Sequence, residues 1–176
     1  MQKLQHLLLV AVAALRMVAC TAEHDGTILS GTVNMTRSDG AQTGQTGFVF
    51  PEDTLLDAGP FTGACKIQRA PEGDTLSLWI ERTEPDPFGL EAFGIVSPIE
   101  PAVEPGTATV SAEASGAAFE DLAGSCTVVF GGYDEYAGSV DIGLDCQGLA
   151  VQDGSASAGT VGLSASLSLD ACEVSE

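Results

Sequence analysis

Cysteine is the residue type in this chain with the widest chemistry, and the 176-residue sequence holds five of them. Thiolates bind metals when they are closely spaced, as in C-x-x-C, and the sequence has no such pair. A catalytic cysteine needs a neighbouring base, usually histidine, and the only histidine after residue 20 is His24. Because His24 lies in the segment that leads to the folded domain, we expect no catalytic cysteine. The roles that remain for the cysteines are disulfide formation and covalent modification.

The N-terminal segment has the pattern of a secretory signal peptide. Lys3 precedes an apolar run from Leu7 to Leu15, and small residues follow, which is the order of basic, apolar and small residues in such peptides. The apolar run is too short for a transmembrane helix, which needs about 20 residues. We therefore predict a helical signal peptide over residues 1–19 that is removed on export.

The signal peptide ends in the sequence MVAC, whose last residue is Cys20. This sequence resembles the lipobox of bacterial lipoproteins, in which an apolar residue and two small residues precede a lipidated cysteine. The resemblance implies that Cys20 begins the mature chain, carries the acyl groups and anchors a short tether over residues 20–26 to the cell envelope, at the outer membrane or the cell surface. Cleavage after Ala19 or Ala22 without lipid would instead give a freely secreted protein.

With Cys20 assigned to the lipid, four cysteines remain, an even number that indicates two disulfides in an exported chain. Four cysteines can pair in three ways. A hairpin with Cys126 opposite Cys146 would bring apolar side chains together across the strands, with Val128 facing Leu144 and Phe130 facing Ile142. The pattern therefore favours a Cys126–Cys146 disulfide, which leaves Cys65 to pair with Cys172.

Acidic residues dominate the charge of the chain: 25 Asp and Glu stand against six Lys and Arg, for a formal net charge of −19. After residue 20 the basic residues are Arg37, Lys66, Arg69 and Arg82. Nucleic-acid binding depends on Lys and Arg that neutralise phosphates, so we exclude nucleic acid as a partner. The same charge argues against electrostatic attachment to anionic lipid, which leaves the lipid anchor as the route to a membrane.

Calcium is the metal that a carboxylate-rich loop would bind, because it takes six to eight oxygen ligands. The candidate ligands are Asp134 and Glu135, at the tip of the predicted hairpin, and Asp141 nearby. These residues do not follow the EF-hand pattern. We predict no metal and no other cofactor, with calcium as the alternative.

The sequence contains no nucleophile elbow, zinc-protease, phosphate-loop or dinucleotide motif. Two carboxylates about 5–10 Å apart can hydrolyse a glycosidic bond, but with so many acids such a pair arises by chance. We predict a non-enzymatic protein with a binding or structural role toward an unidentified protein or glycan. The alternative is a secreted domain that binds or weakly hydrolyses carbohydrate through acidic residues and exposed aromatic ones, namely Trp79, Tyr133 and Tyr136.

Strands must position all these residues, because apolar and polar side chains alternate in several stretches. The alternation is clearest over residues 159–172 and 75–82, and weaker over 61–70 and 107–113. Short Gly, Asp and Pro turns separate the stretches. The pattern predicts an all-β domain over residues 27–176, either an antiparallel β-sandwich, for example an immunoglobulin-like one, or a barrel, with about seven to nine short strands.

Two stretches do not read as strands. Residues 51–60 begin with Pro-Glu-Asp, which suits one turn of helix. Residues 83–106 carry five prolines, and proline cannot donate to a β-ladder. We predict that residues 83–106 form a long connection or an edge, whose apolar residues cap the core or provide a contact surface.

Overall fold

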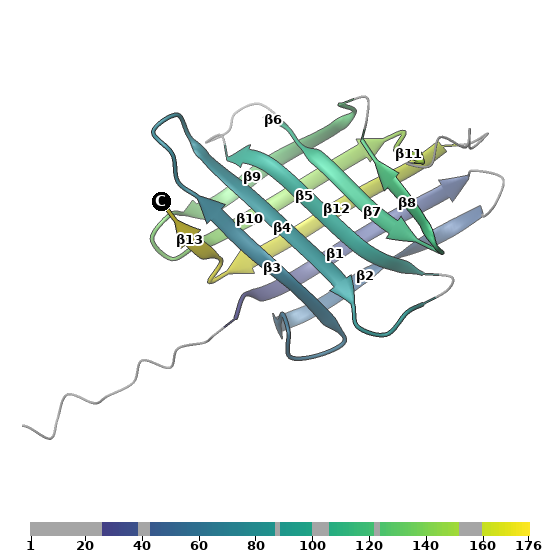
Figure 1. Ribbon diagram of the computed structural model, residues 1–176, viewed down its shortest axis with the longest axis horizontal. Coiled ribbons are helices and arrows are strands. Elements are labelled where there is room, and N and C mark those ends of the chain that lie inside the picture. The colour runs from purple at the N-terminus through teal and green to yellow at the C-terminus, as the bar shows by residue number, and fades with distance from the viewer. Residues whose placement is uncertain (1–25, 39–42, 87–88, 100–105, 122–123, 152–159) are drawn as a thin grey trace, which may run out of the picture.

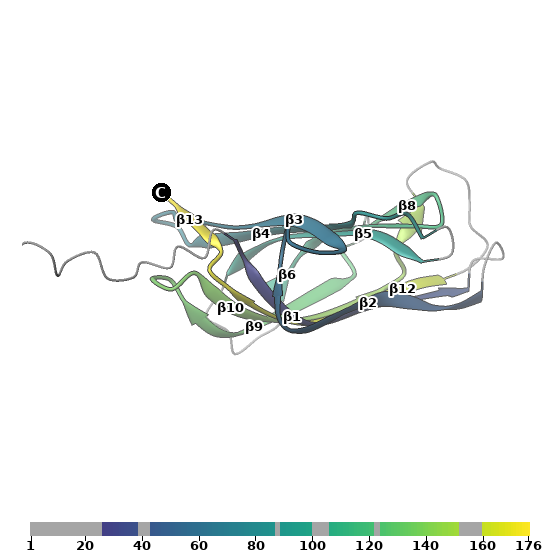
Figure 2. The same ribbon diagram turned by 90° about the horizontal axis from the view of Figure 1, so that it is seen from below.

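The computed structural model describes residues 26–38, 43–86, 89–99, 106–121, 124–151 and 160–176. In these residues the fold is all-β, and two sheets lie face to face as a sandwich (Figure 1, Figure 2). The predicted signal peptide, Cys20 and the predicted tether up to residue 25 fall outside the described residues. None of the described residues forms a helix with the length and apolar character that crossing a bilayer requires.

Sheet A has six strands in the order β2-β1-β12-β10-β9-β6, and all its pairings are antiparallel. Its strands are β1 (Ile28–Ser38), β2 (Thr43–Leu55), β6 (Gly106–Thr107), β9 (Cys126–Asp134), β10 (Ser139–Gln147) and β12 (Thr160–Asp170).

Sheet B has seven strands in the order β11-β8-β7-β5-β4-β3-β13, antiparallel except for the parallel pairing of β13 with β3. From β3 to β8 the strands of this sheet are neighbours in chain order, which is a meander and not the Greek key of immunoglobulin domains. Its strands are β3 (Phe61–Gln68), β4 (Asp74–Arg82), β5 (Leu90–Ile99), β7 (Thr109–Ala114), β8 (Ala117–Glu120), β11 (Ala150–Val151) and β13 (Glu173–Ser175).

The apolar residues of the alternating stretches form the core between the sheets. Leu76, Leu78 and Ile80 of β4 are buried, and β12 buries every second residue from Val161 to Leu169. Each sheet thus covers the core with one face and presents a polar face to water. The sequence predicts this alternation correctly. The described residues hold thirteen strands, more than expected, because several pieces of only two to four residues pair at the sheet margins.

Strand β5 corrects the prediction for residues 83–106. Residues 90–99 form a strand inside sheet B, paired with β4 on one side and β7 on the other. Four of the five prolines flank this strand, and the fifth, Pro98, lies beyond Val96, where the ladder with β7 ends. A proline is tolerated where one side of a strand is unpaired. The apolar side chains of β5 enter the core, namely Leu90, Phe93, Ile95 and Ile99.

The predicted helical turn over residues 51–60 is also wrong, because β2 continues to Leu55. Pro51 is acceptable there since β2 is the edge strand of sheet A. A bulge between Leu29 and Gly31 lets β1 follow this part of β2. Gly31 has a φ of 119°, and a Cβ at this position would lie 2.0 Å from the carbonyl oxygen of Ser166. Only glycine fits this bulge.

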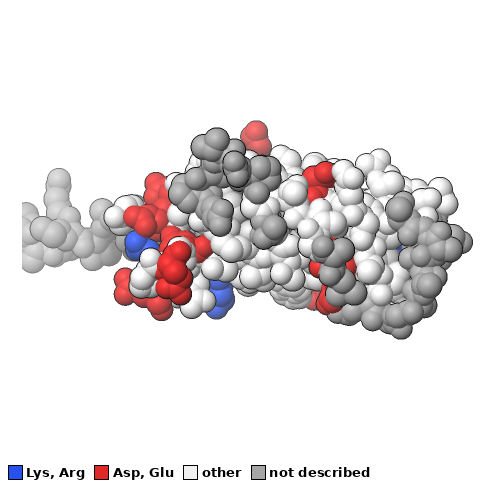
Figure 3. All heavy atoms as spheres, turned by 90° about the horizontal axis from the view of Figure 1, so that it is seen from above, with Lys and Arg blue, Asp and Glu red and all other residues white. Residues whose placement is uncertain are grey.

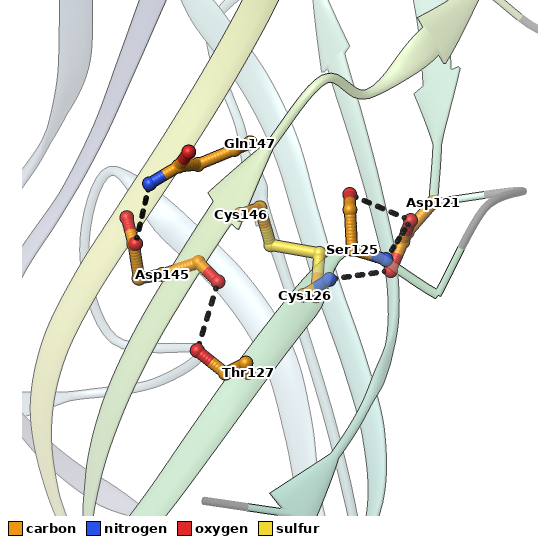
Figure 4. The surroundings of a disulfide bond; sticks show 7 residues. All are labelled: Asp121, Ser125, Cys126, Thr127, Asp145, Cys146 and Gln147. Atoms are coloured by element: carbon orange, nitrogen blue, oxygen red, sulfur yellow. Dashed lines mark hydrogen bonds between the residues drawn. A yellow bond between two sulfur atoms is a disulfide. The ribbon is translucent and has the colours of Figure 1, made fainter.

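Two disulfides cross-link the sandwich, and their pairing is the one that the sequence favours. Cys126 and Cys146 face each other across β9 and β10, in the register predicted for this hairpin (Figure 4). The carboxylate of Asp121 accepts hydrogen bonds from the amides of Ser125 and Cys126, which fixes the entry to β9. The second disulfide joins Cys65 to Cys172.

The Cys65–Cys172 disulfide ties the two sheets together at one end of the sandwich. Cys65 lies on β3 of sheet B, and Cys172 follows β12 of sheet A. The Cys172 amide donates to the carbonyl of Gly138, in the β9–β10 hairpin. A Cβ on Gly138 would lie 2.5 Å from the Cys172 carbonyl oxygen, and the φ of Gly138 is 66°, so this close approach requires glycine.

Polar contacts reinforce the same end of the molecule. Arg69, after β3, forms an ion pair of 2.8 Å with Glu135 of the hairpin and lies over the ring of Tyr136. The hydroxyl of Tyr133 donates to the carboxylate of Asp74. We call these five residues the polar clamp. In Figure 3 acidic side chains gather with basic ones at the left end, where Figure 1 places this hairpin and β13.

The disulfides are expected to stabilise the domain unequally. In the chain-entropy model the stabilisation grows with the loop that is closed; Cys65–Cys172 closes 107 residues and Cys126–Cys146 closes 20. Replacing both cysteines of the longer loop by alanine should lower the free energy of unfolding by ~4.7 kcal/mol, against ~3 kcal/mol for the hairpin pair. Urea unfolding of the two double variants measures this. An equal or reversed order would contradict the assigned role of Cys65–Cys172.

The Tyr133 phenol should titrate abnormally. Burial and the hydrogen bond to Asp74 raise its pKa above the ordinary value of 10.0. Because the folded state holds the proton more tightly, the stabilisation is complete below pH 10 and is lost as the pH rises through the raised pKa. In a Tyr136→Phe variant Tyr133 is the single tyrosine, so tyrosinate absorbance reports on it alone. We expect a midpoint above 10 in the folded protein, lowered by Asp74→Asn; a midpoint at or below 10 would refute the contact.

Candidate ligand-binding face

One row of outward-facing positions runs across four strands of sheet B. The register places Trp79 of β4 opposite Gly94 of β5, Gly94 opposite Ser111 of β7, and Ser111 opposite Glu120 of β8. The adjacent row contains Ala92 of β5, Glu113 of β7 and Ala118 of β8. An aromatic ring, two carboxylates and a hydroxyl therefore share one face of the sheet.

These two rows surround a hollow of about 240 Å³, which we call the Trp79 trench. Trp79 lies on β4 at one side and Glu120 on β8 at the other, with Ser111 and Glu113 on β7 between them. The hollow exists because Ala92 and Ala118 carry only a methyl group as side chain. Its lining also includes Phe93, Ala112 and Phe119, whose side chains belong to the core.

Trp79 reaches this surface because β4 alternates strictly. Its neighbours Leu78 and Ile80 point into the core, so Trp79 points outward, where 44% of its surface is exposed. Tryptophan is costly to leave in water and is enriched at binding surfaces. Gly94 lies directly opposite on β5, and the Ser111 hydroxyl lies close to it, since a Cβ on Gly94 would be 2.8 Å from Ser111 Oγ. An exposed tryptophan beside a hollow is the arrangement expected where a ligand covers the ring.

Glu113 and Glu120 are diagonal neighbours on adjacent strands, so their α-carbons are about 7–8 Å apart. This spacing would suit two carboxylates that act on one substrate. However, Glu113 is exposed and Glu120 only half-buried on an open sheet face. A general acid is normally kept protonated by burial, which this face provides poorly. The arrangement is better suited to binding than to hydrolysis.

The candidate calcium ligands have other partners. Asp134 accepts hydrogen bonds from the amides of Tyr136 and Ala137, which lower the pKa of its carboxyl group. Glu135 belongs to the polar clamp, and Asp141 accepts a hydrogen bond from the Ser168 hydroxyl. Among the described residues no three His, Cys, Asp or Glu side chains converge as a metal site would require.

The three aromatic residues grouped from the sequence do not form one platform. Tyr133 is half-buried, with its hydroxyl bonded to Asp74, and Tyr136 is 86% exposed over Arg69. Both belong to the polar clamp, and neither lines the Trp79 trench. Of the three, it is Trp79 that lines the hollow described above.

Sequence reasoning missed Glu113 and Glu120 as partners of Trp79. The alternation over residues 107–113 places Glu113 on an outward position. The pairing of β7 with β8 through a turn at Ser115 and Gly116 then brings Glu120 to the same face. The short, alanine-rich β8 gave no strand signal of its own, so this pairing was not foreseen.

A second hollow lies on the outer face of sheet A, over β1, β12, β10 and β9, with a volume of about 400 Å³. Its lining is mostly glycine, serine and short apolar residues, and Asp141 is its one charged residue. Without an aromatic ring or a second charge, this hollow offers less to recognise a ligand than the Trp79 trench does.

The chain matches no protein-family model, no curated protein and no solved structure in the comparisons made with each.

Proposed function

We propose that this protein is a non-enzymatic lipoprotein of a bacterial cell envelope. It displays a disulfide-stabilised β-sandwich on a membrane and binds a ligand through the outer face of sheet B. The lipid on Cys20 supplies the attachment, because the acidic domain has little affinity for anionic lipid by itself.

The use of the cysteines carries this proposal. The chain has five, and four of them are paired with one another in the fold. No cysteine is left within the chain to pair with Cys20. The fifth cysteine is the one that follows the apolar N-terminal run in the sequence MVAC. Lipidation of Cys20 accounts for the odd number, and the two disulfides fit an oxidising compartment outside the cytosol.

The length of the tether supports display close to the membrane. Strand β1 begins at Ile28, and five residues separate Cys20 from Gly26, the first described residue. Fully extended, the six residue-to-residue steps from Cys20 to Gly26 span about 20 Å. A domain held so closely would stay near the lipid surface, with the broad faces of both sheets available to ligands.

A binding role is favoured over hydrolysis because of the Trp79 trench. It combines an exposed aromatic ring with polar groups at its margin, as binding sites do, whereas its carboxylates lie on an open face that does not exclude water.

Mass spectrometry of the mature N-terminus tests the attachment. When the full chain is produced in a bacterium with a lipoprotein pathway, we expect the first residue to be Cys20 carrying a diacylglyceryl group and an acylated amino group. Several acyl chains together anchor a protein stably, so the protein should sediment with membranes and be released by detergent.

Cys20→Ser is the matched control, because it removes the lipid site and leaves both disulfides intact. This variant should lose the acyl mass and leave the membrane pellet while it keeps the far-ultraviolet dichroism of the wild type. An unmodified mature chain that begins beyond Cys20 would refute the anchor and favour the freely secreted alternative.

A further inference from the structure

We propose that the Trp79 trench binds a small organic ammonium ion, a cation of the type represented by choline. The inference deepens the proposed binding function by naming the ligand class, and it rests on that function. The geometry and charge of the trench carry it.

The aromatic face provides the first contact. A cation over an indole ring is attracted by the negative face of the π-system, and tryptophan is the strongest partner among the aromatic side chains. Trp79 lines the trench from β4, and Ala92 on the neighbouring strand adds only a methyl group to the lining. A methylated or protonated amine can therefore approach the ring from the trench side.

The carboxylates provide the second contact. Glu113 and Glu120 line the trench opposite Trp79, and Glu81, two residues after Trp79 and on the same face of β4, lies opposite Ala92. The lining residues include no lysine, arginine or histidine. Within the described residues neither Glu81 nor Glu113 forms an ion pair. Glu81 and Glu113 thus present negative charge to the contents of the trench, and the net charge of −19 attracts cations to the whole molecule.

The same lining offers a neutral sugar more hydrogen-bond acceptors than donors. A sugar hydroxyl both donates and accepts hydrogen bonds, and sugar sites normally offer both kinds of partner. Here the polar side chains are two carboxylates, which only accept, the Ser111 hydroxyl and the indole N–H of Trp79. A ligand that brings positive charge and needs no donor from the protein suits this set better.

The size of the trench limits the ligand to a small one. Its volume of about 240 Å³ lies below the range of about 300–1,000 Å³ that is typical for drug-sized ligands. An ammonium head with a short substituent fits this space, whereas an extended chain would project into solvent.

The test is a titration of the full mature protein with choline chloride. Trp79 is the one tryptophan of the sequence, so intrinsic tryptophan fluorescence reports on this site alone. We expect saturable binding that weakens as sodium chloride rises, because salt screens the carboxylates. The uncharged isostere 3,3-dimethylbutan-1-ol should bind at least about tenfold more weakly, since it fills the same space without the charge.

Variants of the trench residues locate the binding site. Because Trp79→Ala removes the fluorophore, binding to the variants is measured by the broadening of the choline methyl proton resonance. Trp79→Ala should weaken binding about five- to thirtyfold, and Glu113→Gln and Glu120→Gln about two- to fivefold each. The controls are Tyr136→Ala, an exposed aromatic residue outside the trench, and Glu52→Gln, an exposed carboxylate on β2 of the other sheet. Both should bind choline like the wild type.

Three outcomes would overturn the inference. Choline could show no saturable binding, or the uncharged isostere could bind as tightly as choline. The control variants could also lose as much choline affinity as the trench variants do. Saturable binding of glucose or cellobiose in the absence of choline binding would replace the ammonium ion with a sugar and keep the binding role. The lipid on Cys20 is measured independently, so an anchored protein that ignores choline refutes only the ligand class. An unlipidated protein that binds choline refutes only the anchor.

Discussion

The structure depends on holding together two sheets that share no β-ladder. Within the described residues no backbone ladder joins sheet A to sheet B, so apolar packing and a few links between the sheets hold them together. The Cys65–Cys172 disulfide is the covalent link, and it lies where β12 leaves sheet A. In a chain with net charge −19 self-repulsion opposes the compact state, so covalent closure has more to offset than it would in a neutral domain.

Polar contacts also hold the two sheets together, and they lie at both ends of the sandwich. The polar clamp joins the β9–β10 hairpin to the turn between β3 and β4. On the other side Arg37 of β1 is buried between the sheets, donates to the carbonyl of Ala114 and lies over the ring of Phe119. All four basic residues after residue 20 thus make contacts within the chain, since Arg82 lies over the rings of Phe48 and Phe61 and Lys66 forms an ion pair with Glu173. Lys66 lies on the outer face of sheet B and pairs with Glu173, whereas the charged residues that line the Trp79 trench are Glu113 and Glu120. This lining is the origin of the proposed preference for a cation.

Local patterns in the sequence predicted the half-buried strands and the hairpin well. Alternation identified β4 and β12, and apolar pairing across the chain identified the register of Cys126 with Cys146. The prediction of a long connection or an edge over residues 83–106 was wrong because it gave the five prolines more weight than the alternation of apolar residues. Phe93, Ile95 and Ile99 do alternate, but Ser97 interrupts the apolar series and Pro98 suggests a break. The trench could not be assembled from the sequence, because it depends on which strands become neighbours. Trp79 was recognised as an outward aromatic residue, whereas Glu113 and Glu120 reach it only through the order β4-β5-β7-β8.

The central claim is that the five cysteines divide into one lipid site and two structural disulfides. Alkylation of the natively produced protein, counted by peptide mass before and after reduction, tests it most directly. The account predicts no alkylated cysteine before reduction and four afterwards, at Cys65, Cys126, Cys146 and Cys172, with Cys20 blocked by its thioether throughout. An alkylated Cys20, or a free thiol at any of the other four before reduction, would contradict it.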